Sequence, residues 1–280
     1  MPLDPAAPIQ FVRLVWRERP LDIEYQWIGA SDPDAPVMVF LHEGLGSLTQ
    51  WKEFPRQLCQ RLRLRGLVFS RYGYGGSTPR PLQERFPVDF MHRQAFDVLP
   101  ELFAALGVHR PWLFGHSDGG SIALLHASRF SGNLRGIVVL APHIFVEELS
   151  LTSIRKVREL YTTTELRSKL ARFHADVDSA FWGWNDVWLD PAFASFDIAD
   201  ECSLITCPIL AIQGREDEYG TLDQIQSIQR RNPAAQLAIL PECGHAPQRD
   251  QPERVMIEVT RFIMDAAKTP APGPSPQHHN

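Results

Sequence analysis

The sequence is poor in cysteine, and its few cysteines are not spaced for a redox pair or a zinc site. The four are Cys59, Cys202, Cys207 and Cys243, with neither a Cys-x-x-Cys pair nor zinc-finger spacing. We therefore interpret them as reduced cysteines of a cytosolic protein. Cys243 lies two residues before His245, and we interpret it as a packing residue rather than a nucleophile.

The sequence also lacks any run of basic residues and any long apolar run. The net charge is −5, and the scattered lysines and arginines argue against nucleic acid or an anionic membrane surface as partner. No apolar stretch approaches the length of a membrane span, so we expect no membrane insertion. Residues 1–5 have neither a basic region nor an apolar region typical of a signal peptide, which favours a cytoplasmic protein.

What the sequence does have is the composition and patterning of a globular α/β protein. Of its 280 residues 44% are hydrophobic and 22% charged. Residues 9–16 and 21–28 predict an antiparallel hairpin with one wet face. Continuous apolar runs then alternate with helical segments. The apolar runs are residues 37–41, 66–70, 112–114, 136–141 and 207–212, and a further strand is expected over 236–240. This alternation predicts a doubly wound, mostly parallel sheet.

The alternation is interrupted between residues 143 and 204. This stretch has helical periodicity, no buried-strand pattern and a cluster of aromatic side chains. We expect a helical cap inserted at 143–204 into a core formed by 1–142 and 205–267. The Pro-rich, polar residues 268–280 predict a disordered tail.

A candidate nucleophile lies between an apolar run and a helical stretch. Residues 114–120 read Phe-Gly-His-Ser-Asp-Gly-Gly, with Ser117 at the centre of Gly-x-Ser-x-Gly. A sharp strand-to-helix turn of this kind lifts the serine Oγ above the end of a sheet. The turn crowds its neighbours, which explains the small residues Gly115 and Gly119.

A serine hydroxyl needs a base to accept its proton and an acid to orient that base. In this type of sheet both come from loops after later strands, in the order Ser, acid, His. Asp217 lies at the usual distance past the strand and Gly214, and we prefer it to Glu216 and Glu218. His245 follows the final strand and is the candidate base.

Two backbone N–H groups are needed where negative charge develops on the substrate oxygen. Asp118, the residue after the nucleophile, is expected to supply one from the start of its helix. The glycine-rich loop after residues 37–41 is expected to supply the other, through Gly44 first and Glu43 second.

With these motifs in order, the chain resembles the α/β-hydrolase-fold enzymes with an inserted cap. The resemblance spans residues 9–267 and rests on His42-Glu43-Gly44, residues 71–77, residues 115–120, Gly214-x-x-Asp217 and residues 244–247. The group includes esterases, lactonases, carbon–carbon bond hydrolases and cofactor-free haloperoxidases. The resemblance implies a metal-free, cofactor-free serine hydrolase that cleaves a small-molecule ester or lactone. A carbon–carbon bond hydrolase, a ligand receptor and a cofactor-free oxygenase are the alternatives, and the oligomeric state is left open.

Two positions depart from the family pattern. The usual His-Gly pair of the oxyanion loop is His42-Glu43 here, and the residue after the nucleophile is Asp118. Relatives of the valacyclovir-hydrolase type also carry Ser-Asp-Gly-Gly at the elbow, which implies recognition of an ammonium group. We hypothesise that Asp118, together with Glu43, favours cationic or neutral substrates. The alternative is a helix-terminal aspartate stabilised by the macrodipole.

Further residues are candidates for the substrate pocket. His116 projects from the turn and is expected to pack there or to line the pocket. Trp182, Trp184 and Trp188 lie in the cap segment, where they either line an apolar pocket or form the small core that holds the cap helices together. We expect one or two of the three rings to face the pocket.

Overall fold

The structure is a computed structural model, and it describes residues 7–268. This part of the chain forms one eight-stranded sheet in the order β1-β2-β4-β3-β5-β6-β7-β8. The strands are β1 (Gln10–Trp16), β2 (Arg19–Gly29), β3 (Val37–Leu41), β4 (Arg65–Phe69), β5 (Trp112–His116), β6 (Gly136–Leu140), β7 (Ile209–Gly214) and β8 (Gln236–Leu240). Neighbours from β4 to β8 pair in parallel, while β2 pairs antiparallel with both β1 and β4. The predicted doubly wound, mostly parallel sheet is confirmed.

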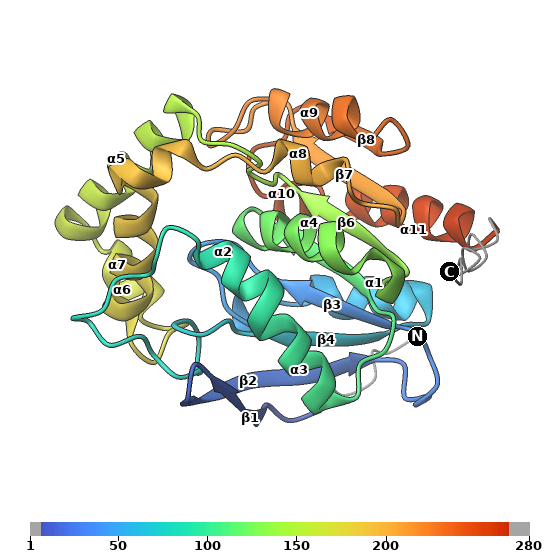
Figure 1. Cartoon of the computed structure of the whole chain (residues 1–280), viewed down its shortest axis with the longest axis horizontal. Coiled ribbons are helices and arrows are strands. Elements are labelled where there is room, and N and C mark those ends of the chain that lie inside the picture. Colours follow the sequence, from blue (N-terminus) through green and yellow to red (C-terminus); the bar gives the residue numbers. More distant parts are fainter. Residues whose placement is uncertain (1–6, 269–280) are drawn as a thin grey trace, which may run out of the picture.

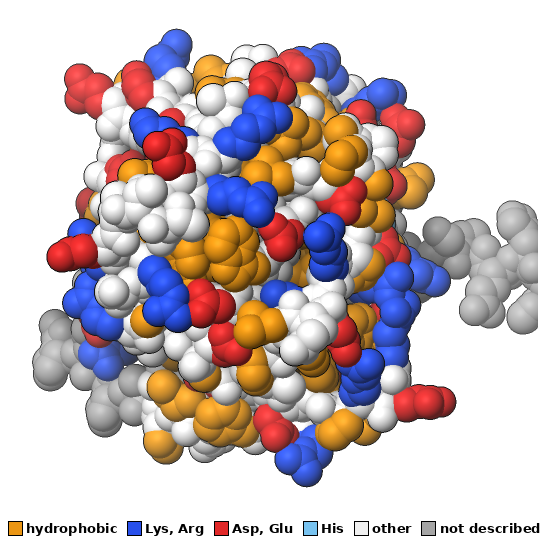
Figure 2. Space-filling model, turned by 90° about the vertical axis from the view of Figure 1, so that its left-hand side faces the viewer, with side chains coloured by type: hydrophobic (Ala, Val, Ile, Leu, Met, Phe, Trp, Pro, Cys, Tyr) orange, Lys and Arg blue, Asp and Glu red, His pale blue; other side chains and the backbone are white. Residues whose placement is uncertain are grey.

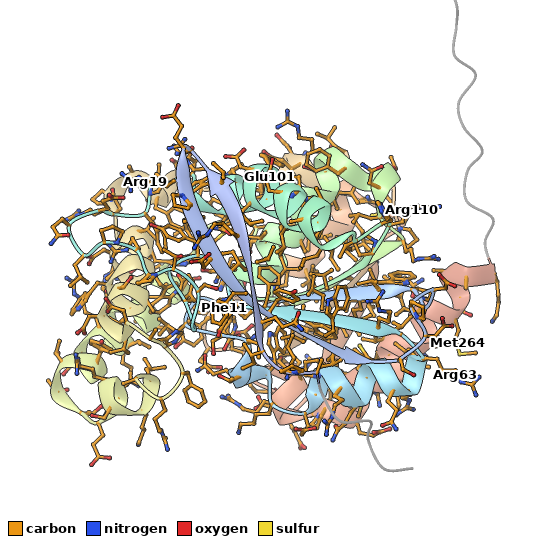
Figure 3. The ribbon with its side chains drawn as sticks, turned by 90° about the horizontal axis from the view of Figure 1, so that it is seen from below. Phe11, Arg19, Arg63, Glu101, Arg110 and Met264 are labelled. Carbon is orange, nitrogen blue, oxygen red and sulfur yellow. The ribbon has the colours of Figure 1, made fainter. Side chains whose placement is uncertain are left out.

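Helices cover both faces of this sheet (Figure 1). On one face lie α2 (Phe90–Arg93), a π-helical turn (Gln94–Val98), α3 (Leu99–Leu106), α4 (Asp118–Phe130) and α9 (Asp223–Arg231). On the other face lie α1 (Phe54–Leu62) and α11 (Pro252–Lys268), and the short α10 (Pro247–Asp250) precedes α11. Figure 3 shows the two layers from below: Glu101 of α3 is on one side of the sheet, and Arg63 at the end of α1 and Met264 of α11 are on the other.

The buried strands separate two apolar cores. All residues of β3, β5, β6 and β7 are buried, as expected for parallel strands covered on both faces. Side chains alternate along them, so Val39 and Leu41 pack under α4, while Met38 and Phe40 pack under α1 and α11. The hairpin is different, because Phe11 and Val15 of β1 are exposed, as the sequence predicts for a wet face.

Only helices occupy the described chain between β6 and β7, apart from one isolated bridge between Phe145 and Asp197. They are α5 (Glu148–Thr163), α6 (Leu166–Leu170), α7 (Val177–Trp188), a 3-10 helix (Pro191–Ser195) and α8 (Ala199–Cys202). α5, α6 and α7 form one end of the molecule (Figure 1). Figure 2 turns that end to the viewer and shows apolar side chains between charges of both signs.

The predicted C-terminal tail, residues 268–280, begins at the end of α11. Lys268, the first residue of that segment, is the last residue of α11, so the helix extends one residue further than expected. Residues 269–280 lie outside the described part. Within residues 7–268, no helix combines the length and the apolar character that a bilayer crossing requires.

The chain approaches itself closely at the turn between β5 and α4. A Cβ on Gly119 would overlap the carbonyl oxygen of Leu41 and lie 2.7 Å from that of His42. A Cβ on Gly115 would lie 2.7 Å from the backbone nitrogen of Gly120. Because backbone atoms cannot rotate away as a side chain can, glycine is required here by space.

We expect Gly119→Ala to destabilise the protein by about 1–3 kcal/mol, because the added methyl group overlaps backbone carbonyls. Thermal unfolding measures this as a Tm lowered by several degrees. Gly132→Ala is the matched control, since nothing lies within 4 Å of a Cβ there. Equal Tm values for the two variants would contradict the close-approach argument.

Candidate active site

The site lies where the winding of the sheet reverses direction. From β3 the chain moves to β4 on one side, and then returns to place β5 on the other side of β3. Loops that follow such adjacent strands diverge and leave a crevice at the carboxyl edge of the sheet. The loop after β3 carries Glu43 and Gly44, and the turn after β5 carries Ser117. These predicted site residues are therefore brought together by topology.

Ser117 has a strained backbone. Its φ is 52° and its ψ is −122°, a region that residues other than glycine rarely occupy. The turn is fixed by hydrogen bonds from the Ser117 N–H to Leu140 O and from the Gly120 and Ser121 N–H groups to Ser117 O. Sheet and helix together thus hold the serine at the start of α4, the position predicted for the nucleophile.

His245 bridges Ser117 and Asp217. Its Nε2 is 3.0 Å from Ser117 Oγ, and its Nδ1 is 2.8 Å from Asp217 Oδ1. Asp217 can only accept at Nδ1, so Nδ1 carries the proton and Nε2 is free to accept one from the serine. All three residues named from the sequence converge, although they come from loops after β5, β7 and β8.

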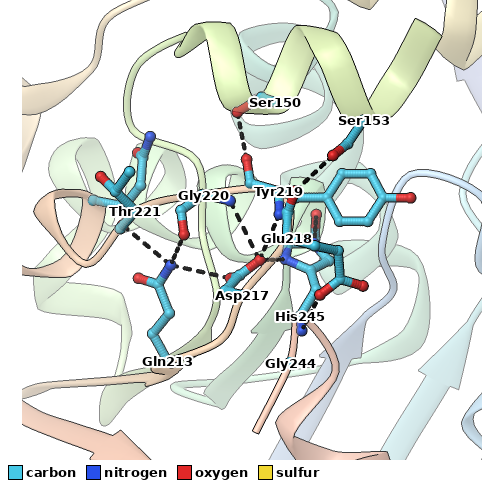
Figure 4. Close-up of polar contacts among 12 residues, drawn as sticks. Ser150, Ser153, Gln213, Asp217, Glu218, Tyr219, Gly220, Thr221, Gly244 and His245 are labelled. Carbon is cyan, nitrogen blue, oxygen red and sulfur yellow. Dashed lines mark hydrogen bonds and ion pairs between the residues drawn. The ribbon is translucent and has the colours of Figure 1, made fainter. Parts of the chain in front are cut away.

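A network of donors holds the Asp217 carboxylate (Figure 4). Its Oδ1 accepts from the N–H groups of Tyr219 at 2.9 Å and Gly220 at 3.3 Å, and Oδ2 accepts from Gln213 Nε2 at 3.0 Å. Burial opposes ionisation of this carboxyl, but the hydrogen bond and charge of His245 and the Tyr219 N–H outweigh it. Its pKa is therefore lower than its ordinary value.

The two neighbouring acids have other partners. Glu218 Oε2 accepts from the His245 N–H at 3.1 Å, and Glu216 Oε2 accepts from the Cys243 N–H at 2.9 Å. Both carboxylates hold the loop that carries His245 and are not in the position of Asp217. The thiol of Cys243 is buried, and burial raises its pKa to about 11, which fits a packing residue.

The two predicted oxyanion donors border the same cavity as Ser117. Gly44 and Asp118 both line it. Among the residues that the structure describes, neither backbone N–H donates to a protein acceptor. Gly44 lies against the indole of Trp184, which a Cβ at position 44 would overlap. The site thus contains two free amides beside the serine.

The carboxyl of Asp118 is buried, and among the described residues only one of its two oxygens has a hydrogen-bond partner. Its Oδ1 accepts from Trp188 Nε1 at 3.2 Å, while Oδ2 has no partner among the described residues. Burial raises the pKa of this carboxyl to about 6, although the Arg71 charge and the Trp188 hydrogen bond lower it. Asp118 is also the first residue of α4. Asp118 is therefore both a residue of the cavity lining and the first residue of α4, and its preference for substrate charge stays a prediction.

Glu43 and His116 face each other beside the serine. Glu43 Oε2 is 3.5 Å from His116 Nδ1, which is also 3.0 Å from Gln248 Nε2. His116 Nε2 is 2.7 Å from His245 O, so it donates to that carbonyl. Burial of Glu43 opposes its ionisation, but the hydrogen bond and charge of His116 outweigh burial and hold the pKa of Glu43 below its ordinary value. Both residues line the cavity.

The cavity has a volume of about 720 Å³ and is lined by both apolar and polar side chains. Apolar side chains form the wall toward α5 and α7: Leu45, Ile154, Val157, Phe173, Trp184 and Trp188. Toward α1 and α10 the lining is mixed. Polar residues there are Gln50, Lys52, Gln57, Gln248 and Arg249, and apolar residues are Trp51, Phe54, Ala246 and Pro252. Two of the three candidate tryptophans therefore border the cavity.

Trp182 does not line this cavity. Its ring packs against Tyr161 and Phe181, and the Arg158 guanidinium lies 5.1 Å from its centroid. The reason is helical geometry, because residues 184 and 188 are four apart and share one face of α7, whereas 182 faces elsewhere. For Trp182 the structure favours the alternative interpretation, packing between cap helices.

Sequence reasoning missed His143 and Tyr219. The His143 ring lies 5.0 Å from Trp188 and 5.5 Å from His245, and Tyr219 lies 4.7 Å from His245. Burial lowers the pKa of His143 to about 3, so this imidazole is neutral. A signal for His143 was its position just after a buried strand that neighbours β5.

Residues 7–268 contain no group of three or more His, Cys, Asp or Glu side chains placed to hold a metal ion. The polar groups that line the cavity are instead the histidines, carboxylates and amides described above.

Comparisons with known proteins identify relatives along most of the chain. Residues 38–258 match the model of the alpha/beta hydrolase family. The putative carbamate hydrolase RutD of Stutzerimonas stutzeri is 29% identical over 253 residues, which cover 80% of this chain and 90% of that protein. Serine hydrolase BPHL of Mus musculus is 27% identical over 195 residues, 68% of this chain and 66% of that protein. A synthase from Klebsiella pneumoniae that forms 2-succinyl-6-hydroxy-2,4-cyclohexadiene-1-carboxylate is 24% identical, with 62% of each chain covered.

Solved structures agree on the fold. The proline iminopeptidase of Mycobacterium smegmatis has a TM-score of 0.73 at 17% identity, covering 92% of this chain and 98% of that one. A thermophilic esterase from Thermogutta terrifontis has a TM-score of 0.72 at 19% identity, covering 92% and 99%. The family model covers most of the chain, and the sheet described above has the same architecture as these structures. The chain belongs to the alpha/beta hydrolase family.

Proposed function

We propose that this protein is a serine hydrolase that cleaves a small carboxylic ester or lactone through Ser117, His245 and Asp217. The observation that carries the proposal is the continuous contact from Ser117 Oγ to His245 Nε2 at 3.0 Å and from His245 Nδ1 to Asp217 at 2.8 Å. Relatives with the names hydrolase and iminopeptidase support a hydrolytic reaction. We also propose residues 143–204 as the cap over a core formed by 1–142 and 205–267.

The chemistry follows from the protonation states at the site. Ser117 Oγ attacks the carbonyl carbon while His245 Nε2 takes the serine proton. The amides of Gly44 and Asp118 stabilise the negative carbonyl oxygen, and Asp217 stabilises the imidazolium. His245 then protonates the leaving alkoxide, and the acyl group stays on Ser117. Water deprotonated by His245 attacks that ester, which releases the acid and restores the serine.

The lining of the cavity supports a substrate with an apolar group on the side of α5 and α7. Six apolar side chains from the β3 loop and the proposed cap suit such a group, while the lining toward α1 and α10 combines apolar side chains with amides and the cations Lys52 and Arg249. The carboxyl of Asp118, with one oxygen unpartnered, supports acceptance of a positive group close to the scissile bond. An ester in which a cationic or neutral group sits near the carbonyl fits this arrangement.

We expect a fluorophosphonate to form a single covalent adduct with the wild-type protein and none with Ser117→Ala. The reason is that only a serine paired with His245 is activated, whereas other serines keep unreactive hydroxyls. Intact mass spectrometry measures the adduct. Ser128→Ala is the matched control, because Ser128 lies on the same helix but donates to Leu125 O.

This measurement also separates the alternatives. No adduct on folded wild-type protein contradicts the proposal and favours a ligand receptor. Hydrolysis that persists in Ser117→Ala contradicts it as well.

We expect the preference for a cationic ester to increase with pH through the pKa of Asp118. The pKa is about 6, so the carboxyl is neutral at pH 5 and anionic at pH 8, where it attracts a cation. The measurement is the kcat/KM ratio of a quaternary ammonium acyl ester to its neutral tert-butyl isostere. The substrate charge does not titrate, and protonation steps common to both substrates cancel. We expect about a tenfold higher ratio at pH 8 than at pH 5.

Asp118→Asn is expected to make this ratio low and independent of pH. Glu43→Gln is the companion variant, since it removes the other cavity-lining carboxylate. A ratio that keeps its pH dependence in Asp118→Asn would contradict recognition by Asp118.

A further inference from the structure

The peptide unit between Glu43 and Gly44 is held at one end and free at the other. Its N–H, on Gly44, is the oxyanion donor of the proposed function, on which this inference rests. Its carbonyl, on Glu43, accepts from His42 Nδ1 at 2.7 Å, Arg71 Nη2 at 2.8 Å and Gly46 N at 3.1 Å. We propose that Arg71 is a positioning residue that fixes and polarises this peptide, so that the Gly44 N–H points at the oxyanion and binds it more strongly.

Arg71 is buried in the chain that follows β4, beside the loop that it contacts. It lies two residues past β4, is 1% exposed, and its guanidinium carbon is 4.7 Å from the centroid of the Tyr74 ring. Because β4 is the neighbour of β3 in the sheet, the side chain reaches the β3 loop from beside it. The contact therefore links the loops of two adjacent strands.

Arg71 also orients the second donor to the same carbonyl. Its backbone N–H donates to His42 Nε2 at 3.0 Å, which leaves the ring proton on Nδ1, where it points at Glu43 O. Burial is the main cause that lowers the pKa of His42, and the Arg71 charge is the second. The ring is therefore neutral in this arrangement. One residue thus acts on the Glu43 carbonyl twice, directly through Nη2 and indirectly through His42.

Donors at a peptide carbonyl strengthen the N–H of the same unit. Hydrogen bonds in such chains polarise one another, by about 10–30% per bond. Here one donor is a buried cation, whose field is screened little. The charge of Arg71 also offsets nearby negative charge, because Glu43 and Asp118, two acidic residues, line the same cavity as Ser117. A cation behind the peptide lowers the free energy of the oxyanion relative to the neutral carbonyl.

The arrangement explains how the loop accommodates Glu43 in place of the usual glycine. The side chain of Glu43 turns to His116, while its carbonyl turns to Arg71. The carbonyl and the side chain of Glu43 thus have separate partners, and those of the carbonyl hold the backbone of the loop.

The test compares Arg71→Met, Arg71→Gln and Arg71→Lys with Arg80→Met. Arg80 is a matched control: it is a second buried arginine in the chain after β4, it lies over the Phe86 ring, and it donates to the carbonyls of Pro81 and Ser179. Each variant is assayed for kcat and KM on one ester, for inhibition by a trifluoromethyl ketone, for fluorophosphonate adduct formation and for Tm.

We expect Arg71→Met to lower kcat about 10–100-fold, which is a smaller effect than the loss of a whole oxyanion donor. We expect KM to change less than about threefold. The ketone forms an oxyanion on Ser117, so its Ki is expected to increase in proportion to the loss in kcat/KM. Arg71→Gln keeps a hydrogen-bond donor but no charge, so its kcat is expected to lie between those of Arg71→Met and the wild type. Arg71→Lys restores the charge, so its kcat is expected to be higher than that of Arg71→Gln. Arg80→Met is expected to lower Tm but to keep kcat within about twofold.

The outcomes that overturn the inference are distinct. An unchanged kcat in folded Arg71→Met, or in Arg71→Gln if the Met variant does not fold, would overturn it. A loss of kcat as large in Arg80→Met would assign the effect to general destabilisation and would also overturn it. No adduct on wild-type protein would overturn the proposed function and this inference together, whereas a normal adduct with an unchanged Arg71→Gln would overturn this inference alone.

Discussion

The site depends on the close contact between Gly119 and the carbonyls of Leu41 and His42. This contact brings the first turn of α4 against the end of β3, with no room for a Cβ. The turn after β5 and the loop after β3 are therefore held as one unit, and they supply Ser117, both proposed oxyanion amides and Glu43. The strain stored at Ser117, with its φ of 52°, is tolerated because the surrounding sheet and helix fix the turn from both sides.

Partners, rather than burial alone, decide the charge of each acid at the site. Asp217 and Asp118 are both buried carboxyls, but their pKa values shift in opposite directions. Asp217 receives backbone and side-chain donors and faces His245, so the anion is favoured. Asp118 has one indole donor and an unpartnered oxygen, so burial dominates. One site thereby holds an orienting anion and a carboxyl that titrates near pH 6.

The helices between β6 and β7 are coupled to the proposed chemistry through two tryptophans of α7. Trp188 donates to Asp118, and Trp184 fills the space beside Gly44 that a side chain there would need. Each indole thus contacts a residue that supplies a proposed oxyanion amide. Substitution of Trp184 or Trp188 is therefore expected to act on the reacting centre as well as on the shape of the cavity.

The sequence by itself predicted the central strands and their order along the chain, because short continuous apolar runs between turns favour strands covered on both faces, and their alternation with helices favours a parallel sheet. It also predicted which serine, acid and histidine would converge, because loops at one edge of such a sheet meet at its reversal point. Helical spacing places Trp182 on a different face of α7 from Trp184 and Trp188, but it does not say which face borders the cavity. Only the tertiary structure decided that Trp182 points away from the cavity, that His143 borders it, and that Arg71 reaches the Glu43 carbonyl. The physical reason is that strand and helix patterns depend on residues close together in the sequence. These contacts instead join residues that are distant in the sequence and meet only when the sheet, its loops and the inserted helices pack together.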